Sequence, residues 1–474
     1  MAGLTPNWEA LQAAIGGEVV PAGLPAYDRL PTPFNARFDP VRPQAVVRCA
    51  TPEDVAETIG FARRHRLEIV PRSGGHGFAG HSVTQGIVID VTPMGSVSVS
   101  GETARVGAGT GLGDLYQALQ AHDRTVPGGT CPSVGIAGLT LGGGLGLLGR
   151  RWGLTADHLL AAQIVLADGR IVECDQHHDT ELFWALRGGG AGNFGVVTSM
   201  VFRLRPAPAA TNFRLVWPHP KAAAVIAAWQ GWSPTAPDEL AASLVLATPA
   251  EVDRPPVVVV FGAMLASPSD TTEQLEHLIG RVDAAPATTF GKHLSYWETL
   301  DRWARLDHTT GDPAGVAPPG RVAPPGYHVI KSEFFSRPLP DDAIAALVGT
   351  LTNGRAAGQS RELDFSPWGG AYNRVPANAT AFVHRDPLYS LKHAVVVDPA
   401  ASMAAKQAAH DWATRSWASV HRWGSGRVFP NFADPDLDNW ADAYYGGNLD
   451  RLLRVKARYD PGNVFRFHQS LPVR

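Results

Sequence analysis

Pro-Arg-Ser-Gly-Gly-His-Gly occupies residues 71–77, and Gly-Gly-Thr-Cys-Pro-Ser-Val-Gly occupies residues 128–135. Each stretch sets one reactive side chain, His76 or Cys131, in glycine-rich backbone. Glycine has no Cβ, so such backbone reaches positive φ and approaches a ligand closely. An imidazole and a thiol in two such loops could bond one planar ligand from two sides.

Length and composition narrow the class of protein. The 474 residues exceed one hydrophobic core and predict two or three domains, and the chain is 45% hydrophobic and 18% charged, as in ordinary globular proteins. A net charge of −3 and a pI near 6.6, without long charge runs, favour neither nucleic acid nor a membrane surface as partner. Three cysteines make no disulfide framework, and no secretory signal or membrane span is visible, so we expect a cytoplasmic protein.

Hydrophobic periodicity divides the chain into three stretches. Residues 1–208, with a core at about 40–206, alternate short strands with helices, and Asp168-Gly169 predicts a hairpin turn. Residues 209–425 interleave strand-like runs with Ala-rich helices, an α+β pattern with an antiparallel sheet. Residues 426–474 read as two helices followed by the turn Asp460-Pro461-Gly462-Asn463.

Further motifs occur in a fixed order with the two glycine loops. Gly-Gly-Gly-Leu-Gly (142–146) and Gly-Asn-Phe-Gly-Val-Val-Thr (192–198) follow them, and Tyr-Tyr-Gly-Gly-Asn (444–448) precedes Tyr-Asp-Pro-Gly-Asn-Val-Phe-Arg (459–466). Together these motifs resemble the berberine-bridge-enzyme-like flavin oxidases, within the vanillyl-alcohol-oxidase (PCMH-type) FAD-binding superfamily. The resemblance covers about residues 40–206 and 440–474.

The resemblance implies a fold and a cofactor. It implies a two-part FAD-binding domain, 1–208 with 426–474 returning to it, and a substrate domain over 209–425 whose antiparallel sheet is backed by helices. It also implies FAD bonded twice, with a His76 nitrogen on the methyl group of the dimethylbenzene ring and Cys131 on carbon six. The residues expected to contact FAD are Arg72, Ser73, Gly74, Gly75, His76, Gly77, His81, Cys131, Val134, Gly135, Gly138, Gly142, Gly143, Gly144, Gly146, Asp157, Gly195, Val197, Asn448 and Asn463.

Each reactive residue also has a plainer interpretation. His76 could be an ordinary loop histidine, or a metal ligand with His81, although no third ligand has suitable spacing, and we expect no metal site. Cys131 could be a small buried hydrophobe, whereas Cys49 and Cys174 lie in expected strands and are interpreted as structural. Gly144–Gly149 matches G-x-G-x-x-G, but no strand precedes it, so a Rossmann site is rejected.

The resemblance also assigns catalytic and substrate contacts. It places the general base at Tyr444, with Tyr445 packing on the flavin, and an O₂ pocket at Val134, which could otherwise be plain packing. Trp368, Tyr372 and His384 are expected to face the substrate, with the Trp368 indole stacking on a sugar or aromatic ring.

The predicted function is that of an FAD-dependent oxidase. It would remove hydride from an alcohol or sugar carbon of a bulky small molecule, and O₂ would reoxidise the flavin to give hydrogen peroxide. An oligosaccharide oxidase, a flavin dehydrogenase and a flavin-binding protein without turnover remain as alternatives.

Overall fold

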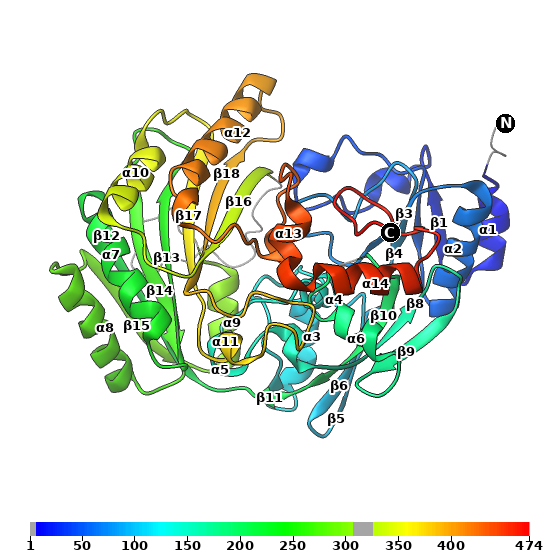
Figure 1. The fold of residues 1–474 in the computed structure, drawn as a ribbon, viewed down its shortest axis with the longest axis horizontal. Helices are drawn as coiled ribbons and strands as arrows, with labels where there is room; N and C mark the ends of the chain where they lie inside the picture. The colour runs from blue at the N-terminus through cyan, green and yellow to red at the C-terminus, as the bar shows by residue number, and fades with distance from the viewer. Residues whose placement is uncertain (1–5, 191, 307–325, 474) are drawn as a thin grey trace.

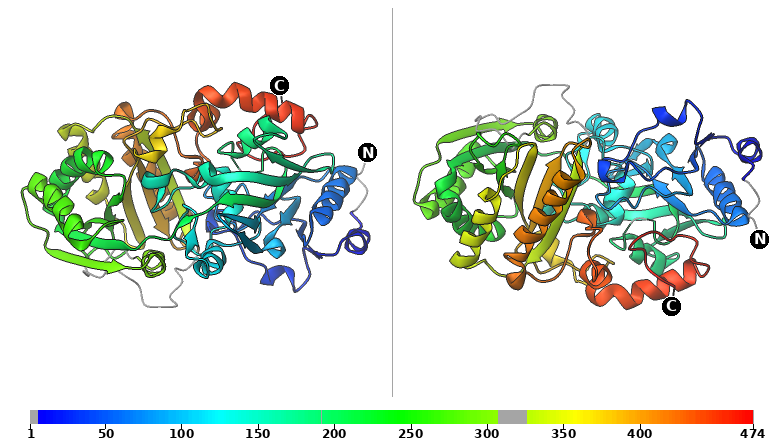
Figure 2. Two further views of the ribbon diagram at one scale, coloured as in Figure 1. Left: turned by 90° about the horizontal axis from the view of Figure 1, so that it is seen from below. Right: turned by 90° about the horizontal axis from the view of Figure 1, so that it is seen from above.

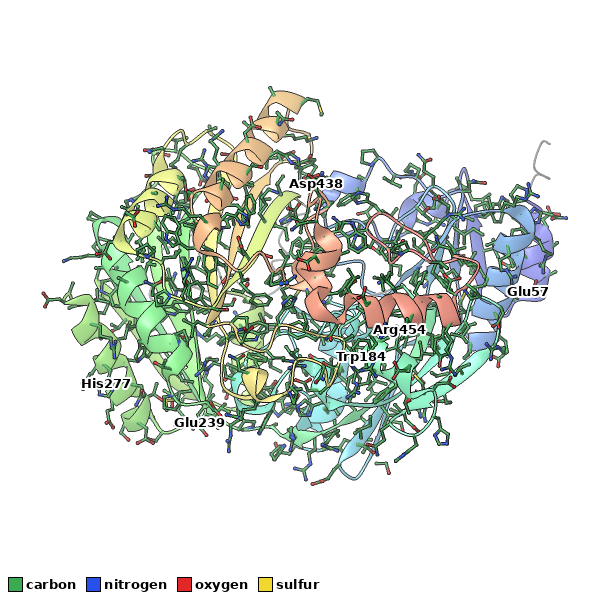
Figure 3. The ribbon with its side chains drawn as sticks, in the orientation of Figure 1. Glu57, Trp184, Glu239, His277, Asp438 and Arg454 are labelled. Carbon is green, nitrogen blue, oxygen red and sulfur yellow. The ribbon has the colours of Figure 1, made fainter. Side chains whose placement is uncertain are left out.

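The computed structural model describes residues 6–190, 192–306 and 326–473. The chain forms two lobes, and the chain end returns from the second lobe to the first (Figure 1). Polar side chains such as His277 and Arg454 are spread over the surfaces of both lobes (Figure 3).

The first lobe begins with a four-stranded sheet. Its order is β1 (Glu18–Pro21), β2 (Ala45–Arg48), β4 (Ile87–Asp90) and β3 (Ile69–Arg72), and only β1 runs antiparallel to its neighbour. α1 (Trp8–Ala14) and α2 (Pro52–His65) pack beside it. Thr51 begins α2 with a capping box, in which its hydroxyl accepts from Asp54 N and the Asp54 carboxylate accepts from Thr51 N. The chain leaves β3 directly into the loop that carries His76.

The second sheet of this lobe is fully antiparallel. Its order is β5 (Val97–Ser100), β6 (Thr103–Gly107), β10 (Val196–Arg203), β8 (Leu159–Val165) and β9 (Ile171–Asp175). The predicted hairpin around Asp168-Gly169 is confirmed as the β8–β9 connection. The remaining elements of the lobe are α3 (Leu112–Gln120), α4 (Ile136–Leu141), α5 (Gly149–Trp152), α6 (Thr180–Leu186) and the short pair β7 (Arg124–Thr125) and β11 (Arg205–Pro206).

The second lobe is built on a seven-stranded antiparallel sheet. Its order is β15 (Thr288–Leu294), β12 (Ala210–Pro218), β14 (Val257–Met264), β13 (Leu240–Thr248), β17 (Gln359–Pro367), β18 (Tyr389–Val397) and β16 (Tyr327–Phe335). One face is covered by α7 (Ala222–Trp232), α8 (Pro268–Val282), α10 (Asp341–Thr352) and α12 (Met403–Ala418), as Figure 2 shows. The predicted antiparallel sheet backed by helices is therefore confirmed.

The opposite face of this sheet points towards the first lobe. α9 (Tyr296–Ala304) and α11 (Ala371–Arg374) lie on this side. The sequence did not predict β15, β17, β18 or α9, and β17 is the element that matters most for the site.

The last stretch packs against the first lobe. α13 (Trp440–Tyr445) and α14 (Leu449–Tyr459) share a hydrophobic cluster with α6 and β10, and Figure 1 shows α14 running along that lobe. A wholly buried pair, Lys456 Nζ to Asp460 Oδ2 at 2.6 Å, fixes the end of α14. None of the described helices combines the length and apolarity needed to cross a bilayer.

Candidate functional site

The two glycine loops touch each other through backbone. A Cβ on Gly74 would lie 2.3 Å from Gly135 N, and a Cβ on Gly135 would lie 2.1 Å from Ser73 Oγ. Real Cβ atoms do not approach that closely, so both positions require glycine. The glycines therefore bring the His76 loop and the Cys131 loop to one place.

The Cys131 loop is a tight turn. Val134 N donates to Cys131 O at 3.2 Å, with Pro132 at the second position, where its fixed φ suits a β-turn. Leu112 N and Gly113 N, at the start of α3, donate to Val134 O and Pro132 O, both at 2.9 Å. Backbone hydrogen bonds from the start of α3 therefore stabilise the turn, and Cys131 remains exposed.

A hydroxyl lies between the two reactive side chains. His76 Nε2 is 3.0 Å from Ser133 Oγ, and Cys131 Sγ is 3.5 Å from the same oxygen. The ring nitrogen and the sulfur therefore lie within about 6.5 Å of each other. Burial lowers the pKa of His76, which favours a neutral ring. The described residues contain no cluster of three or more metal-ligating side chains, so the metal alternative gains no support.

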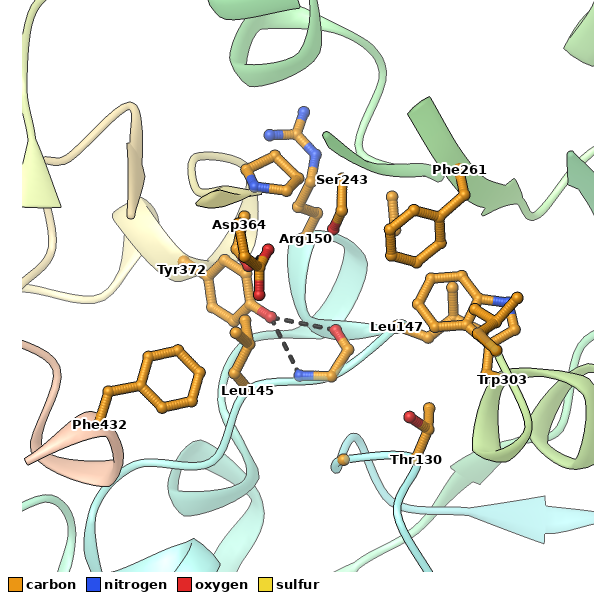
Figure 4. A pocket seen from close by; sticks show the side chains of 16 residues that line it. Thr130, Leu145, Leu147, Arg150, Ser243, Phe261, Trp303, Asp364, Tyr372 and Phe432 are labelled. Atoms are coloured by element: carbon orange, nitrogen blue, oxygen red, sulfur yellow. Dashed lines mark hydrogen bonds between the residues drawn. The ribbon is translucent and has the colours of Figure 1, made fainter. Parts of the chain in front are cut away.

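A cavity opens beside the Cys131 loop. It has a volume of about 230 Å³ and is partly open to solvent. Its wall combines the loop, the inner sheet face and aromatic rings (Figure 4). The lining residues are Gly129, Thr130, Leu145, Gly146, Leu147, Arg150, Ala241, Ser243, Phe261, Trp303, Leu306, Asp364, Ser366, Pro367, Tyr372 and Phe432.

A cluster of charged side chains on β17 and β18 lies at the cavity wall. Asp364 is the cross-strand neighbour of Lys392, and Lys392 Nζ lies 2.9 Å from Asp364 Oδ2 and 3.5 Å from Glu362 Oε1. Burial opposes the charge of Lys392, but the two carboxylates outweigh burial and raise its pKa. Ser366 donates to Asp364 Oδ1 at 3.3 Å. Of these four side chains, Asp364 and Ser366 line the cavity, and Figure 4 shows Asp364 across from Thr130.

The residues beside the two loops fit a large planar cofactor. Added methyl groups at Gly77 and Gly138 would meet no described atom within 4 Å, so backbone is open to a ligand there. The buried atoms His81 Nε2 and Ser82 Oγ have no hydrogen-bond partner among the described residues, although buried polar atoms are normally paired. His81 also packs against Phe467, and burial first and then His468 lower its pKa to about 4.

The other predicted glycines face protein. Cβ atoms at Gly142, Gly143, Gly144 and Gly146 would strike Asn431, Phe382, Thr155 and the Gly128 carbonyl, respectively. Gly195 approaches the Val165 carbonyl, and Val197 pairs with Ile164 in the sheet. These positions are explained by packing of the chain on itself. Helix α4, not a strand, precedes Gly144–Gly149, which confirms the rejection of a Rossmann site.

Tyr444, the predicted base, is buried and bonded to protein groups. Its ring is 3% exposed, and its hydroxyl accepts from Asp434 N at 2.9 Å and donates towards Asp434 O or Gln469 Oε1. Burial, the first cause, raises its pKa far above the ordinary value. Tyr445 is equally buried, and its hydroxyl contacts Asn193. Neither tyrosine lines the cavity, so both hold the C-terminal segment in place.

The predicted substrate contacts also need correction. Trp368 is completely buried and stacks on Tyr372 at 4.5 Å, so its indole cannot stack on a substrate. Tyr372 does reach the cavity wall, but its hydroxyl donates to Gly146 O at 3.2 Å. His384 lies behind this cluster, with Nε2 2.9 Å from Tyr444 O, and burial lowers its pKa to about 3.

Three predicted FAD contacts have side chains that bind protein groups, whereas the buried Asn463 Oδ1 has no hydrogen-bond partner among the described residues. Asp157 forms a bidentate pair with Arg385 at 2.7 and 2.9 Å, and Asn448 Nδ2 donates to Ala377 O at 2.7 Å, so both tie the lobes together. Arg72 donates from Nε to Ser82 O and from an NH group to Pro31 O. Asn463, at φ 48°, closes the turn after α14.

Sequence reasoning missed Asp364, Lys392 and the bridging Ser133. The signal for Asp364 was the alternation Glu362-Leu363-Asp364-Phe365-Ser366, which is typical of a strand with one polar face. Leu363 and Phe365 are fully buried on the helix side, as such a strand requires. Cys174 lies in β9 as expected, whereas Cys49 follows the end of β2; both are buried, and burial raises the pKa of each thiol to about 12.

Comparison with known proteins places this geometry in context. Residues 43–175 match the FAD binding domain family, and residues 428–472 match the berberine and berberine like family. The chain is 33% identical to the uncharacterized FAD-linked oxidoreductase YvdP of Bacillus subtilis (strain 168), over 96% of this chain and 98% of YvdP. BBE-like 1 of Physcomitrella patens has the same fold, with a TM-score of 0.88, 28% identity and 99% of both chains covered. The xylooligosaccharide oxidase of Myceliophthora thermophila, solved with xylobiose, gives a TM-score of 0.83 at 25% identity over 98% of both chains.

Proposed function

The chain belongs to the berberine-bridge-enzyme-like family of FAD-linked oxidoreductases, and from that premise we propose that it is an oxidase of a bulky alcohol or sugar. FAD, when bound, supplies the acceptor for a hydride from the substrate carbon and passes the electrons to O₂, which leaves as hydrogen peroxide. The protein supplies binding, orientation and a proton acceptor. The observation that carries the proposal is the cavity that joins the Cys131 loop to the Asp364 carboxylate.

We place the flavin on the two interlocked loops, bonded to both His76 and Cys131. The short distances from both side chains to Ser133 Oγ support this double attachment, because one ring system must reach both. Exposure of Cys131 and the open backbone at Gly77 and Gly138 leave room for the ring. In this proposal residues 1–208 and 426–474 form the FAD-binding domain, and residues 209–425 form the substrate domain.

Asp364 is the proton acceptor in this proposal. It is the carboxylate of the cavity wall, and the Lys392 ammonium lies 2.9 Å from its Oδ2. A substrate hydroxyl placed against Asp364 would donate its proton to Oδ1 or Oδ2 as the carbon loses hydride. Ser366, bonded to Oδ1, would orient the carboxylate.

The aromatic wall of the cavity sets the kind of substrate. Phe261 and Trp303 form an edge-to-face pair 5.6 Å apart, and Phe432 lies further along the wall. Such surfaces stack on flat aromatic rings or on the apolar faces of sugars. A secondary metabolite with a hydroxyl group is our first candidate. An oligosaccharide is the second, favoured by the Trp303 indole and by the likeness to the xylooligosaccharide oxidase.

Val134 bears on the choice between oxidase and dehydrogenase. It is partly buried in the Cys131 turn and packs against the core of the first lobe, next to the proposed flavin position. We keep it as the wall of an O₂ path, because a small side chain there leaves more space than leucine or isoleucine would. A flavin-binding protein without turnover would have no use for a charged dyad in its cavity, which argues against that alternative.

The proposal is tested with Asp364→Asn. The wild-type protein is first supplied with a panel of alcohols, sugars and oligosaccharides in air, and hydrogen peroxide release identifies a substrate. With that substrate, Asp364→Asn should lower kcat by roughly 10²- to 10⁴-fold, the range for loss of a general base. Glu362→Gln is the matched control, since Glu362 shares Lys392 but does not line the cavity. Equal losses in both variants, or none in Asp364→Asn, would remove Asp364 from the mechanism.

A further inference from the structure

We propose that Ser133 is a positioning residue for covalent attachment of the flavin. Its hydroxyl holds the His76 imidazole in the tautomer that carries hydrogen on Nε2, so that Nδ1 makes the bond to the flavin. The same hydroxyl donates to Cys131 Sγ and couples the two attachment residues. This inference rests on the proposed function, in which both residues bond the flavin.

The geometry gives Ser133 two partners. His76 Nε2 lies 3.0 Å from Ser133 Oγ, within the usual range for a hydrogen bond. Cys131 Sγ lies 3.5 Å from the same oxygen, a normal distance for sulfur. Ser133 is exposed and its backbone is held by the turn between Cys131 and Val134, so the hydroxyl is free to serve these two groups.

The number of hydrogens that Ser133, His76 and Cys131 can each donate determines the direction of these two hydrogen bonds. A serine hydroxyl has one hydrogen to give, and a neutral imidazole has one donor and one acceptor nitrogen. The reactive form of Cys131 is the thiolate, which only accepts, so the Ser133 hydrogen goes to Sγ. Ser133 Oγ can then only accept from His76, which places the ring hydrogen on Nε2. The lone pair on Nδ1 remains available to bond carbon.

A neighbouring aromatic ring, that of Phe34, restricts the orientation of the His76 imidazole. Phe34 stacks on the His76 ring, with centroids 4.7 Å apart and planes 19° apart. Phe34 is itself tied to the loop, since its N–H donates to Gly75 O at 3.0 Å. Among the described residues, hydrogen bonds to the His76 ring involve Nε2 alone. Ring plane and tautomer are therefore fixed by different contacts, Phe34 and Ser133.

The attachment steps balance with dioxygen as oxidant. At His76, the Nδ1–carbon bond forms, a C–H bond of the flavin methyl group breaks, and the Nε2–H bond gives up its proton. The two protons and the two electrons left on the flavin reduce one O₂ to hydrogen peroxide. At Cys131, the S–C bond replaces the C–H bond of carbon six, and a second O₂ takes up the two electrons, the proton from that C–H bond and the proton that the thiol lost on ionisation. Ser133 is unchanged in both steps and passes the Nε2 proton onward.

The test compares Ser133→Ala with Ser133→Thr in the full-length protein purified from aerated cultures. Flavin that stays with acid-denatured protein is quantified, and peptide masses locate it on His76, Cys131 or both. NMR of the isolated histidyl flavin distinguishes the Nδ1 isomer from the Nε2 isomer. Thr130→Val is the control for a lost hydroxyl in the same loop, because Thr130 is the neighbour of Cys131 in sequence and no described hydrogen bond joins it to His76 or Cys131.

The expected result is specific to the hydroxyl. Wild type, Ser133→Thr and Thr130→Val should carry flavin on Nδ1 and on sulfur. Ser133→Ala should attach flavin about tenfold more slowly, as loss of one hydrogen bond to a reacting group predicts, and should yield a mixture of nitrogen isomers. Ser133→Ala with the wild-type yield and isomer would overturn the inference, as would Ser133→Thr behaving like Ser133→Ala. Wild-type protein without covalent flavin would instead overturn the attachment stated in the proposed function, and this inference with it.

Discussion

The two walls of the site position reactive groups by different means. On the loop side, Gly74 and Gly135 bring His76 and Cys131 together because side chains are absent at the contact. On the sheet side, Asp364 is placed by strand alternation and by its cross-strand partner Lys392, so side chains make the contact. The loop wall therefore tolerates almost no added atom. The sheet wall tolerates changes of shape but is sensitive to charge.

The largest expected effect comes from filling the loop contact. In Gly135→Ala the new Cβ would lie 2.1 Å from Ser73 Oγ and 2.4 Å from Gly74 N, and backbone cannot turn aside as a side chain can. We expect a loss of about 3 kcal/mol or more in the free energy of unfolding, at the upper end for overpacking, together with loss of bound flavin. Urea unfolding and the flavin absorbance of the purified protein measure both effects.

Gly447→Ala is the matched control for that substitution. A Cβ there would meet no described atom within 4 Å, and the backbone is not in the left-handed region. It should leave the unfolding free energy within about 1 kcal/mol of wild type. If Gly135→Ala were as stable as Gly447→Ala, the two loops could not be in the contact described above.

On the sheet wall, Lys392→Met should produce the next largest effect. The substitution keeps most of the volume but leaves Glu362 and Asp364 without their shared cation. Asp364 also loses a charge-assisted hydrogen bond that holds it at the cavity wall, so kcat/KM should fall about tenfold. We expect a stability loss of about 2–3 kcal/mol, less than for a fully enclosed pair, because the Lys392 side chain is 16% exposed.

The Lys392→Met experiment has an internal control in Lys392→Arg. Arginine keeps the positive charge and should keep more of the wild-type kcat/KM than methionine does. An unchanged kcat/KM in Lys392→Met, with a substrate found as described above, would show that Asp364 does not depend on this cation.

Local signals explain how much of the molecule was predictable. The glycine loops, the capping box at Thr51 and the Asp168-Gly169 hairpin depend on a few consecutive residues, and their chemistry can be read directly. The proximity of His76 and Cys131 also depends on local signals, because the glycines beside each residue are what allow the two loops to come into contact.

The sheet wall could not be predicted in the same way. Asp364 faces Lys392 only because β17 pairs with β18 in one particular register. The sequence around either residue contains no signal that predicts this register. The surroundings of Tyr444 and Trp368 were not predictable for a different reason. Their motifs are clear, but whether an aromatic ring faces a cavity or a core depends on neighbours such as Gln469 and Tyr372, which lie elsewhere in the chain.

The smallest expected effect concerns His393, on the face of β18 that packs against the helices. Lys392 points to the charged side, whereas the next residue, His393, is fully buried among the helices, with Nδ1 2.8 Å from Ser416 Oγ. Burial, followed by the charge of Lys331, lowers the pKa of His393 to about 3. In the unfolded chain the ring titrates near 6.5, so between pH 6.5 and 3 the unfolded state binds a proton that the native state excludes.

Acidification should therefore destabilise the protein through His393. Between pH 7 and pH 5 this residue alone should remove about 2 kcal/mol of unfolding free energy, since each pH unit below its unfolded pKa is worth about 1.4 kcal/mol. His393→Gln keeps a hydrogen-bonding side chain but cannot titrate, so its stability should fall less over the same range. Urea unfolding at pH 7 and pH 5 compares the two proteins. Parallel losses would mean that His393 has the same pKa in the native and unfolded states, and that the helix side of β18 tolerates charge as the cavity side does.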